Sequence, residues 1–171
     1  GRFERVTEEE IKISENLPPN KKRQFLYTRG FMRDILSKYL DIPPLDLPLE
    51  AYPGKPLKIR GNLGNISLSH CSDAFLLGWS DINLGVDIER KDRKFDARAI
   101  IKKFYLNEEK EELRLISWEQ LRYRALSLWV LKEAAIKCSE GKISTDLSNW
   151  FISKNKKDAI NRSLNIILNT K

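Results

Sequence analysis

Two acidic side chains stand two positions apart in the apolar stretch LGVDIER, residues 84–90. If this stretch is a β-strand, residues i and i+2 point to the same face, so Asp87 and Glu89 project together. Adjacent carboxylates repel each other unless a cation lies between them, and Mg²⁺ takes one or two carboxylates together with phosphate oxygens and water. The pair therefore indicates either a metal site or an edge strand whose acids face solvent.

A second stretch, WVLKEAAIK at 129–137, places an acid among cations on a predicted helix. Glu133 lies four residues after Trp129 and four before Lys137, so the three share one helix face, with Lys132 beside them. One interpretation is a Glu–Lys pair at the surface. The other is that Glu133 completes a three-carboxylate metal site and that the two lysines hold phosphates around it.

A third feature is arginine on the apolar face of a predicted helix over residues 22–40. Arg29 falls in the middle of that face and Arg33 close to its edge. An inward-facing arginine must be paired or must extend its charge to water. Its partner is either a structural carboxylate or a bound phosphate, which matches guanidinium geometry. The single histidine, His70, ends a predicted strand, a position where a lone histidine is more often structural.

The elements that must position these residues follow from hydrophobic periodicity and turn signals. The pattern predicts a helix over 22–40, then a proline-rich connection over 41–56. Further along it predicts strands at 65–70, 74–80 and 84–89, helices at 96–105, from Asn107 and from Ser117 to Gly141, and a strand within 147–155. Ser117 and Gln120 form a capping-box pattern. The predicted class is α+β (α/β), with antiparallel strands packed on one long helix per half.

Composition narrows the function classes. The 171 residues are 41% hydrophobic, enough for one domain or two closely packed halves. The net charge of +7 favours an anionic partner, although no zinc-finger spacing or RNA-binding aromatic motif accompanies it. No apolar run approaches the ~18 residues of a membrane span, no signal-peptide pattern opens the chain, and the two cysteines form no CxxC pair. A cytoplasmic protein is expected.

Taken together, these stretches resemble the 4′-phosphopantetheinyl transferase superfamily. The motifs that carry the resemblance are GKP (54–56), NISLSHCSD (65–73), GVDIE (85–89), KKFYLNEE (102–109) and WVLKEAAIK (129–137). The resemblance covers about residues 20–150, and GVDIE followed by the KE motif is its specific part. It implies the long, monomeric kind, a single transferase unit over 1–171. Two similar halves, about 1–83 and 84–171, would be related by a pseudo-two-fold axis, with the active site between them.

The resemblance also implies a reaction. The family moves the 4′-phosphopantetheine arm of coenzyme A onto a serine of an apo acyl or peptidyl carrier protein, depends on Mg²⁺, and releases 3′,5′-ADP. Coenzyme A would be the co-substrate and an acidic carrier protein the partner, with neither nucleic acid nor membrane involved. The alternative is a non-enzymatic basic module that binds an acidic protein or nucleic acid.

Residue by residue, the resemblance implies three groups of site residues. The magnesium ligands fall on Asp87, Glu89 and Glu133. The coenzyme A contacts fall on Arg29, Lys55, Ser69 and His70, with Lys132 next to the metal ligand. The catalytic roles fall on Lys137, which faces phosphate, and on Glu109, which would help to deprotonate the attacking serine, with neighbouring Glu108 as the alternative. The chain departs from the family at Lys142, where the second glycine of a Gly-x-Gly turn usually stands.

Overall fold

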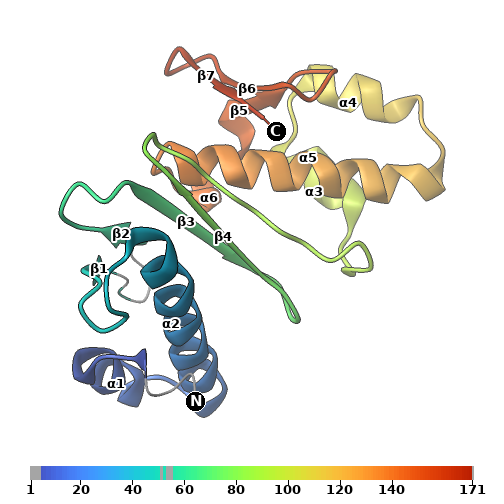
Figure 1. Cartoon of the computed structure of the whole chain (residues 1–171). Helices are drawn as coiled ribbons and strands as arrows, with labels where there is room; N and C mark the ends of the chain where they lie inside the picture. Colours follow the sequence, from blue (N-terminus) through green and yellow to red (C-terminus); the bar gives the residue numbers. More distant parts are fainter. Residues whose placement is uncertain (1–4, 51, 53–55, 171) are drawn as a thin grey trace. The chain divides into compact units, whose positions relative to one another are not determined.

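The computed structural model describes residues 5–50, 52 and 56–170 and divides into two compact units, residues 1–64 and 65–171 (Figure 1). Both units combine helices with small antiparallel sheets, so the predicted α+β class is confirmed. The predicted halves, 1–83 and 84–171, and their pseudo-two-fold relation stay predictions. None of the helices in the described ranges has both the length and the apolar character that crossing a bilayer requires.

The first unit is built on two helices, α1 (Glu8–Glu15) and α2 (Pro19–Leu40). A two-stranded antiparallel sheet follows, β1 (Leu49–Glu50) with β2 (Lys58–Ile59). Helix α2 starts with proline at its first position, where the missing N–H would have no helical partner. It ends at Leu40, and the following Asp41 caps it in the left-handed conformation with φ 53°. The helix predicted over 22–40 is therefore confirmed and starts one turn earlier.

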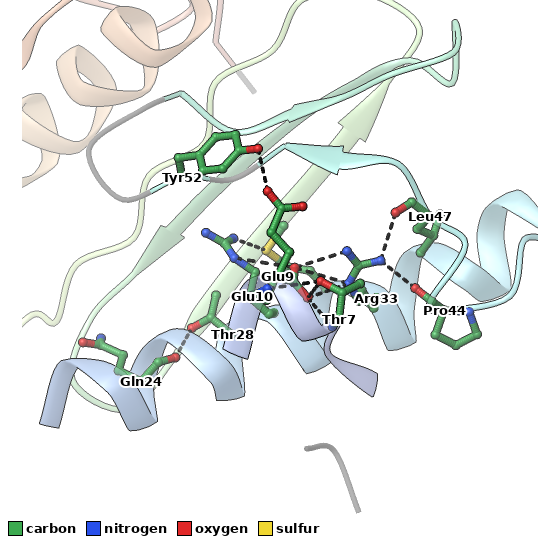
Figure 2. Close-up of polar contacts among 11 residues, drawn as sticks. Thr7, Glu9, Glu10, Gln24, Thr28, Arg33, Pro44, Leu47 and Tyr52 are labelled. Carbon is green, nitrogen blue, oxygen red and sulfur yellow. Dashed lines mark hydrogen bonds and ion pairs between the residues drawn. The ribbon is translucent and has the colours of Figure 1, made fainter. Parts of the chain in front are cut away.

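A buried ion pair joins the two helices of this unit (Figure 2). Arg33 Nε lies 3.1 Å from Glu10 Oε2, and both side chains are almost excluded from solvent. The same guanidinium donates hydrogen bonds to the carbonyl oxygens of Pro44, at 2.7 Å, and Leu47, at 2.9 Å. A buried charge is tolerated when it is paired and hydrogen-bonded in this way. For Arg33, the structural carboxylate is therefore the observed partner, and it ties the proline-rich connection to α2.

Thr7 closes the first turn of α1 with a capping box. Glu10 N donates to Thr7 Oγ1 at 3.2 Å, and Thr7 N donates to Glu10 Oε2 at 2.9 Å. We expect Thr7→Ala to lower the free energy of unfolding by about 1 kcal/mol, measured by urea denaturation, because one helix N–H loses its acceptor. Ser37→Ala within α2 is the control, with an expected change below about 0.5 kcal/mol. Equal losses in the two variants would argue against the cap.

The second unit is organised around one long helix, α5 (Trp118–Cys138). Helix α3 (Ala97–Phe104) and a three-stranded antiparallel sheet pack against it, and their shared core includes Leu128, Ile136 and Trp150. The strands of this sheet are β5 (Trp150–Ile152), β6 (Asp158–Asn161) and β7 (Ile166–Asn169). The unit also contains the hairpin β3 (Asn65–His70) and β4 (Phe75–Ser80), α4 (Asn107–Arg114), α6 (Ile143–Asp146) and a 3₁₀ turn (Leu147–Asn149).

Most elements predicted for this unit are confirmed, and the helices differ from the prediction mainly at their ends. Helix α5 starts at Trp118, but Ser117 makes no side-chain cap, so the predicted capping box is wrong. The helix also ends at Cys138, before the predicted stop at Gly141. In α4 the N-cap is Leu106, whose N–H donates to Glu109 Oε2 at 2.9 Å. Asn107, from which this helix was predicted, is its first helical residue.

Candidate active site

The segment that carries the first acidic pair is extended but belongs to no sheet, so the strand predicted at 84–89 is wrong. Its backbone is held by hydroxyl groups. Val86 N donates to Ser67 Oγ at 3.1 Å, and Ile88 N donates to Ser69 Oγ at 3.3 Å. Both serines are buried and lie two positions apart on β3, so they present their hydroxyls on the same face. Serine side chains thus take the place that the carbonyls of a neighbouring strand would have in a ladder.

Gly85 brings this segment into backbone contact with α5. A methyl group at Gly85 would overlap the carbonyl oxygen of Ala134 and the backbone nitrogen of Cys138. Only glycine allows such an approach, because it has no Cβ. Lys137 Nζ donates to Val86 O at 3.1 Å and adds a second link between the helix and the segment. The close approach places Asp87 against the helix that carries the second motif.

We expect Gly85→Ala to separate the segment from α5. The obstructing atoms are helix backbone, so the cost should reach the upper part of the about 1–3 kcal/mol typical of overpacking, with reduced order at Asp87. Gly78→Ala is the comparison, because its methyl group would meet only the side-chain ends of Leu84, at 2.7 Å, and Val86, at 2.8 Å. Thermal melts of the two variants should show a smaller loss for Gly78→Ala. The reverse order would contradict the close approach at Gly85.

Asp87 lies at the centre of the candidate site. Its Oδ1 accepts hydrogen bonds from Ser69 Oγ and from Lys137 Nζ, each at 2.7 Å. Its Oδ2 is buried and has no hydrogen-bond partner among the described residues. A buried anionic oxygen without a partner is costly, so this atom is suited to bind a cation.

Glu133 faces the same place from α5, one turn before Lys137. Burial raises the pKa of Glu133 above its usual value, and the negative charge of Asp87 acts in the same direction. The positive charges of Lys137 and Arg93 act in the opposite direction. Two neighbouring carboxylates, one of which raises the pKa of the other, are the donor set that a hard divalent cation stabilises.

Glu89, the third predicted ligand, has another partner. Its carboxylate forms an ion pair with Arg93, four residues later. Across the described ranges, no three acidic, histidine or cysteine side chains gather closely enough to hold a metal ion. The structure thus brings Asp87 and Glu133 together and keeps Glu89 in an ion pair. Glu89 also borders a cavity of about 390 Å³, which α5 lines with Leu126, Val130 and Leu131.

Glu109 and Lys132 form a buried ion pair away from these acids. Lys132 Nζ lies 2.7 Å from Glu109 Oε2, and the two side chains are 0% and 1% exposed. Lys132 also donates to the carbonyl oxygens of Leu147 and Trp150, and Glu109 Oε1 accepts from Ile152 N at 3.1 Å. Burial lowers the pKa of Lys132, whereas the charge of Glu109 raises it. These contacts join α4, α5, the 3₁₀ turn and β5. The catalytic and cofactor roles of the pair stay predictions.

The remaining predicted coenzyme A contacts lie in different places. Arg29 is buried in the first unit, with its guanidinium 4.5 Å from the ring centre of Phe25 and its Nε 4.0 Å from Glu10 Oε1. Burial lowers the pKa of Arg29 to about 10. Lys55 lies outside the described residues. Ser69 already holds Asp87, and His70 is exposed at the end of β3 with its ring edge against Phe75.

Sequence reasoning missed Ser67, Gly85 and Arg93, and it gave Ser69 a contact with coenzyme A and none with Asp87. Ser67 and Ser69 bind the backbone of the acidic segment, Gly85 permits its contact with α5, and Arg93 pairs with Glu89. The local excess of basic residues over 91–104 is the sequence feature that could have drawn attention to Arg93. The serines alternate along β3, which indicated that they share a face but not what they bind.

The second unit, with paired acids and a lysine between an extended segment and a long helix, matches a known family. The family model described as the 4′-phosphopantetheinyl transferase superfamily matches residues 83–170. The chain belongs to this superfamily.

Two curated proteins are similar to the chain. The 4′-phosphopantetheinyl transferase HetI of Nostoc sp. is 29% identical over 127 residues, covering 71% of this chain and 53% of that protein. A protein of Synechocystis sp. named "Putative 4′-phosphopantetheinyl transferase slr0495" is 27% identical over 141 residues, covering 80% of this chain and 57% of that protein. The matched part of the chain thus spans little more than half the length of each relative.

Proposed function

We propose that the chain transfers the 4′-phosphopantetheine arm of coenzyme A to a serine of an apo carrier protein and releases 3′,5′-ADP. Membership of the superfamily supports the reaction class. The observation that carries the proposal is the cluster of Asp87, Glu133 and Lys137, in which a buried carboxylate oxygen has no partner in the described chain. The serine oxygen attacks one phosphorus of a pyrophosphate that is already negatively charged, so the site must supply positive charge.

Mg²⁺ is the cation that fits this donor set. Asp87 Oδ2 and the carboxylate of Glu133 would hold it, in line with the one or two protein carboxylates that Mg²⁺ takes beside phosphates and water. When bound, the ion would screen the pyrophosphate and stabilise the charge that develops on the leaving oxygen. Glu89 is the third proposed ligand, and its carboxylate is paired with Arg93 in this structure.

Lys137 is the proposed phosphate-facing catalytic residue. Its ammonium group is held 2.7 Å from Asp87 Oδ1, and its side chain keeps 24% of its surface exposed. A partly exposed lysine next to the cation site can reach a phosphate oxygen while Asp87 keeps it in place. It would neutralise or protonate the departing phosphate.

The other proposed contacts divide into two sets. His70 is exposed near Ser69, so its ring is available to a ligand such as the nucleotide end of coenzyme A. For Ser69 we propose that its hydroxyl positions Asp87, since it already makes that hydrogen bond. Arg29, Lys55 and Lys132 stay proposed coenzyme A contacts by family resemblance alone, and Glu109 or Glu108 stays the proposed residue that helps to deprotonate the serine.

An acidic carrier protein is the proposed partner. The net charge of +7 would increase the rate of association with a negatively charged surface. A monomeric, cytoplasmic enzyme that binds neither nucleic acid nor membrane remains part of this proposal.

The reaction is tested by intact mass measurement of apo carrier proteins from fatty-acid, polyketide and nonribosomal-peptide synthesis, incubated with the chain, coenzyme A and Mg²⁺. The expected result is a mass gain of one phosphopantetheine on at least one carrier, and none when coenzyme A is omitted. Binding of carriers without any mass gain across the panel would favour the non-enzymatic basic module instead.

A further inference from the structure

Arg93 lies among the acids of the candidate site. Its guanidinium pairs with Glu89 and lies 5.9 Å from the ring centre of Trp129. Trp129 precedes Glu133 on α5 by one helical turn. Its charge also acts on Glu133, where it opposes the upward shift of the pKa caused by burial. Arg93 therefore supplies positive charge at the place where the proposed function puts a divalent ion.

The backbone around Arg93 is anchored, so this placement is built into the fold. Arg93 N donates to Arg90 O at 3.1 Å and closes a turn. From α5, Arg122 donates to the carbonyl oxygens of Lys91, at 2.7 Å, and of Arg93, at 3.3 Å. Arg122 thus fixes the turn to the helix, and the side chain of Arg93 extends from the turn to Glu89.

We propose that Arg93 is a built-in counter-ion of Glu89 that competes with the divalent cation for this carboxylate. Two positive charges on one carboxylate repel each other, so Glu89 is a stronger ligand of the cation when Arg93 leaves it. The ion pair is partly exposed, 39% for Arg93 and 18% for Glu89, so water stabilises the separated guanidinium and the exchange is inexpensive. Arg93 thus weakens cation binding and leaves Asp87 and Glu133 as the ligands engaged first. This inference rests on the proposed function.

The test is a titration of the full chain with Mn²⁺, in which electron paramagnetic resonance reports the free ion. We expect Arg93→Gln to bind Mn²⁺ about tenfold more tightly than the unchanged chain. The gain would come from Glu89, which becomes a stronger ligand without its counter-ion, and changes in the partners of metal-ligating groups typically alter metal affinity by about 10–100-fold. Arg93→Lys retains the charge and should stay closer to the unchanged chain.

Two controls separate direct competition from a general effect of charge. Arg98→Gln removes a positive charge on α3. The guanidinium of Arg98 lies 4.6 Å from the ring centre of Trp118, so this variant should bind Mn²⁺ as tightly as the unchanged chain. In a Glu89→Gln background, Arg93→Gln should gain much less than tenfold, because the shared carboxylate is gone. Melting temperatures verify that each variant is folded.

Each outcome decides the proposal. An unchanged affinity in Arg93→Gln, or the same gain with and without Glu89, overturns it. If Glu133→Gln weakens Mn²⁺ binding while Arg93→Gln leaves it unchanged, the proposed metal site stands and the competition does not. If neither the unchanged chain nor Arg93→Gln binds Mn²⁺, both fail.

Discussion

Replacing Glu133 by glutamine is expected to slow phosphopantetheine transfer by about a thousandfold at saturating coenzyme A and Mg²⁺. The change removes one of the two carboxylates at the candidate cation site but keeps the shape of the side chain. Metal stabilisation of a phosphoryl transition state is worth several kcal/mol, and about 4 kcal/mol corresponds to a thousandfold change in rate. The rate is measured from the intact mass of the carrier protein over time.

Glu119→Gln is the matched control for this variant. Glu119 lies in the first turn of the same helix, α5, and is exposed. It should keep almost the full rate. The Glu133→Gln protein should melt at or above the temperature of the unchanged chain, since burial and Asp87 make a charge at this position costly. If the Glu133→Gln protein transferred phosphopantetheine at the normal rate, the carboxylate of Glu133 would not be a metal ligand in the reaction.

The largest expected loss of stability is that of Lys132→Met. This substitution leaves Glu109 charged, buried and without its cation, and it leaves the carbonyl oxygens of Leu147 and Trp150 without their donor. Breaking a buried ion pair by removing one partner typically costs about 3–5 kcal/mol. The measurement is the free energy of unfolding from urea denaturation, followed by tryptophan fluorescence, because Trp150 lies beside the pair.

The double variant Lys132→Met/Glu109→Gln tests whether the loss comes from an unpaired charge. With both charges removed, much of the stability should return, although the carbonyl groups remain unpaired. Glu109→Gln alone should also destabilise the fold, because Lys132 then loses its counter-ion. If Glu109→Gln abolished transfer without lowering stability, the catalytic role predicted for Glu109 would prevail over the structural one.

The part of the site on α5 could be predicted from sequence, because helical periodicity alone determines which residues share a face. Glu133 and Lys137 share a face since they are four residues apart on a helix, and α5 confirms the helix. The contact of Lys137 with Asp87 joins residues 50 positions apart in sequence, and hydrophobic periodicity does not predict it. Family resemblance placed these residues in one site, and the physical cause, the contact of Gly85 with the α5 backbone, became visible only in the structure.

The segment at 84–89 shows where pattern reasoning failed. Its β-branched residues and alternation favour a strand, but a strand also requires a partner with free backbone groups. Hydroxyls of Ser67 and Ser69 fill that place, so the segment stays extended outside any sheet. The expected common direction of Asp87 and Glu89 relied on regular strand geometry, and Arg93 instead holds Glu89 in an ion pair.

Burial explains why the structure places Lys132 and Glu109 differently from the sequence-based expectation. Lys132 was expected to lie toward phosphates because it stands beside Glu133 on the helix, and the family resemblance gave Glu109 a role toward the attacking serine. The structure buries them together, and hydrogen bonds to backbone groups of β5 and the 3₁₀ turn satisfy their remaining atoms. Sequence patterns indicate which faces are apolar, but they do not show which charged residues will be paired inside the core.

The central claim is that Asp87 and Glu133, from two separate elements, bind one divalent ion. The most direct measurement is an anomalous difference map from crystals of the chain soaked in MnCl₂, with data collected at the manganese absorption edge. The account predicts one strong peak between the carboxylates of Asp87 and Glu133, in contact with Asp87 Oδ2. A well-ordered pair of carboxylates with no manganese peak between them, at a concentration that supports transfer, would contradict it.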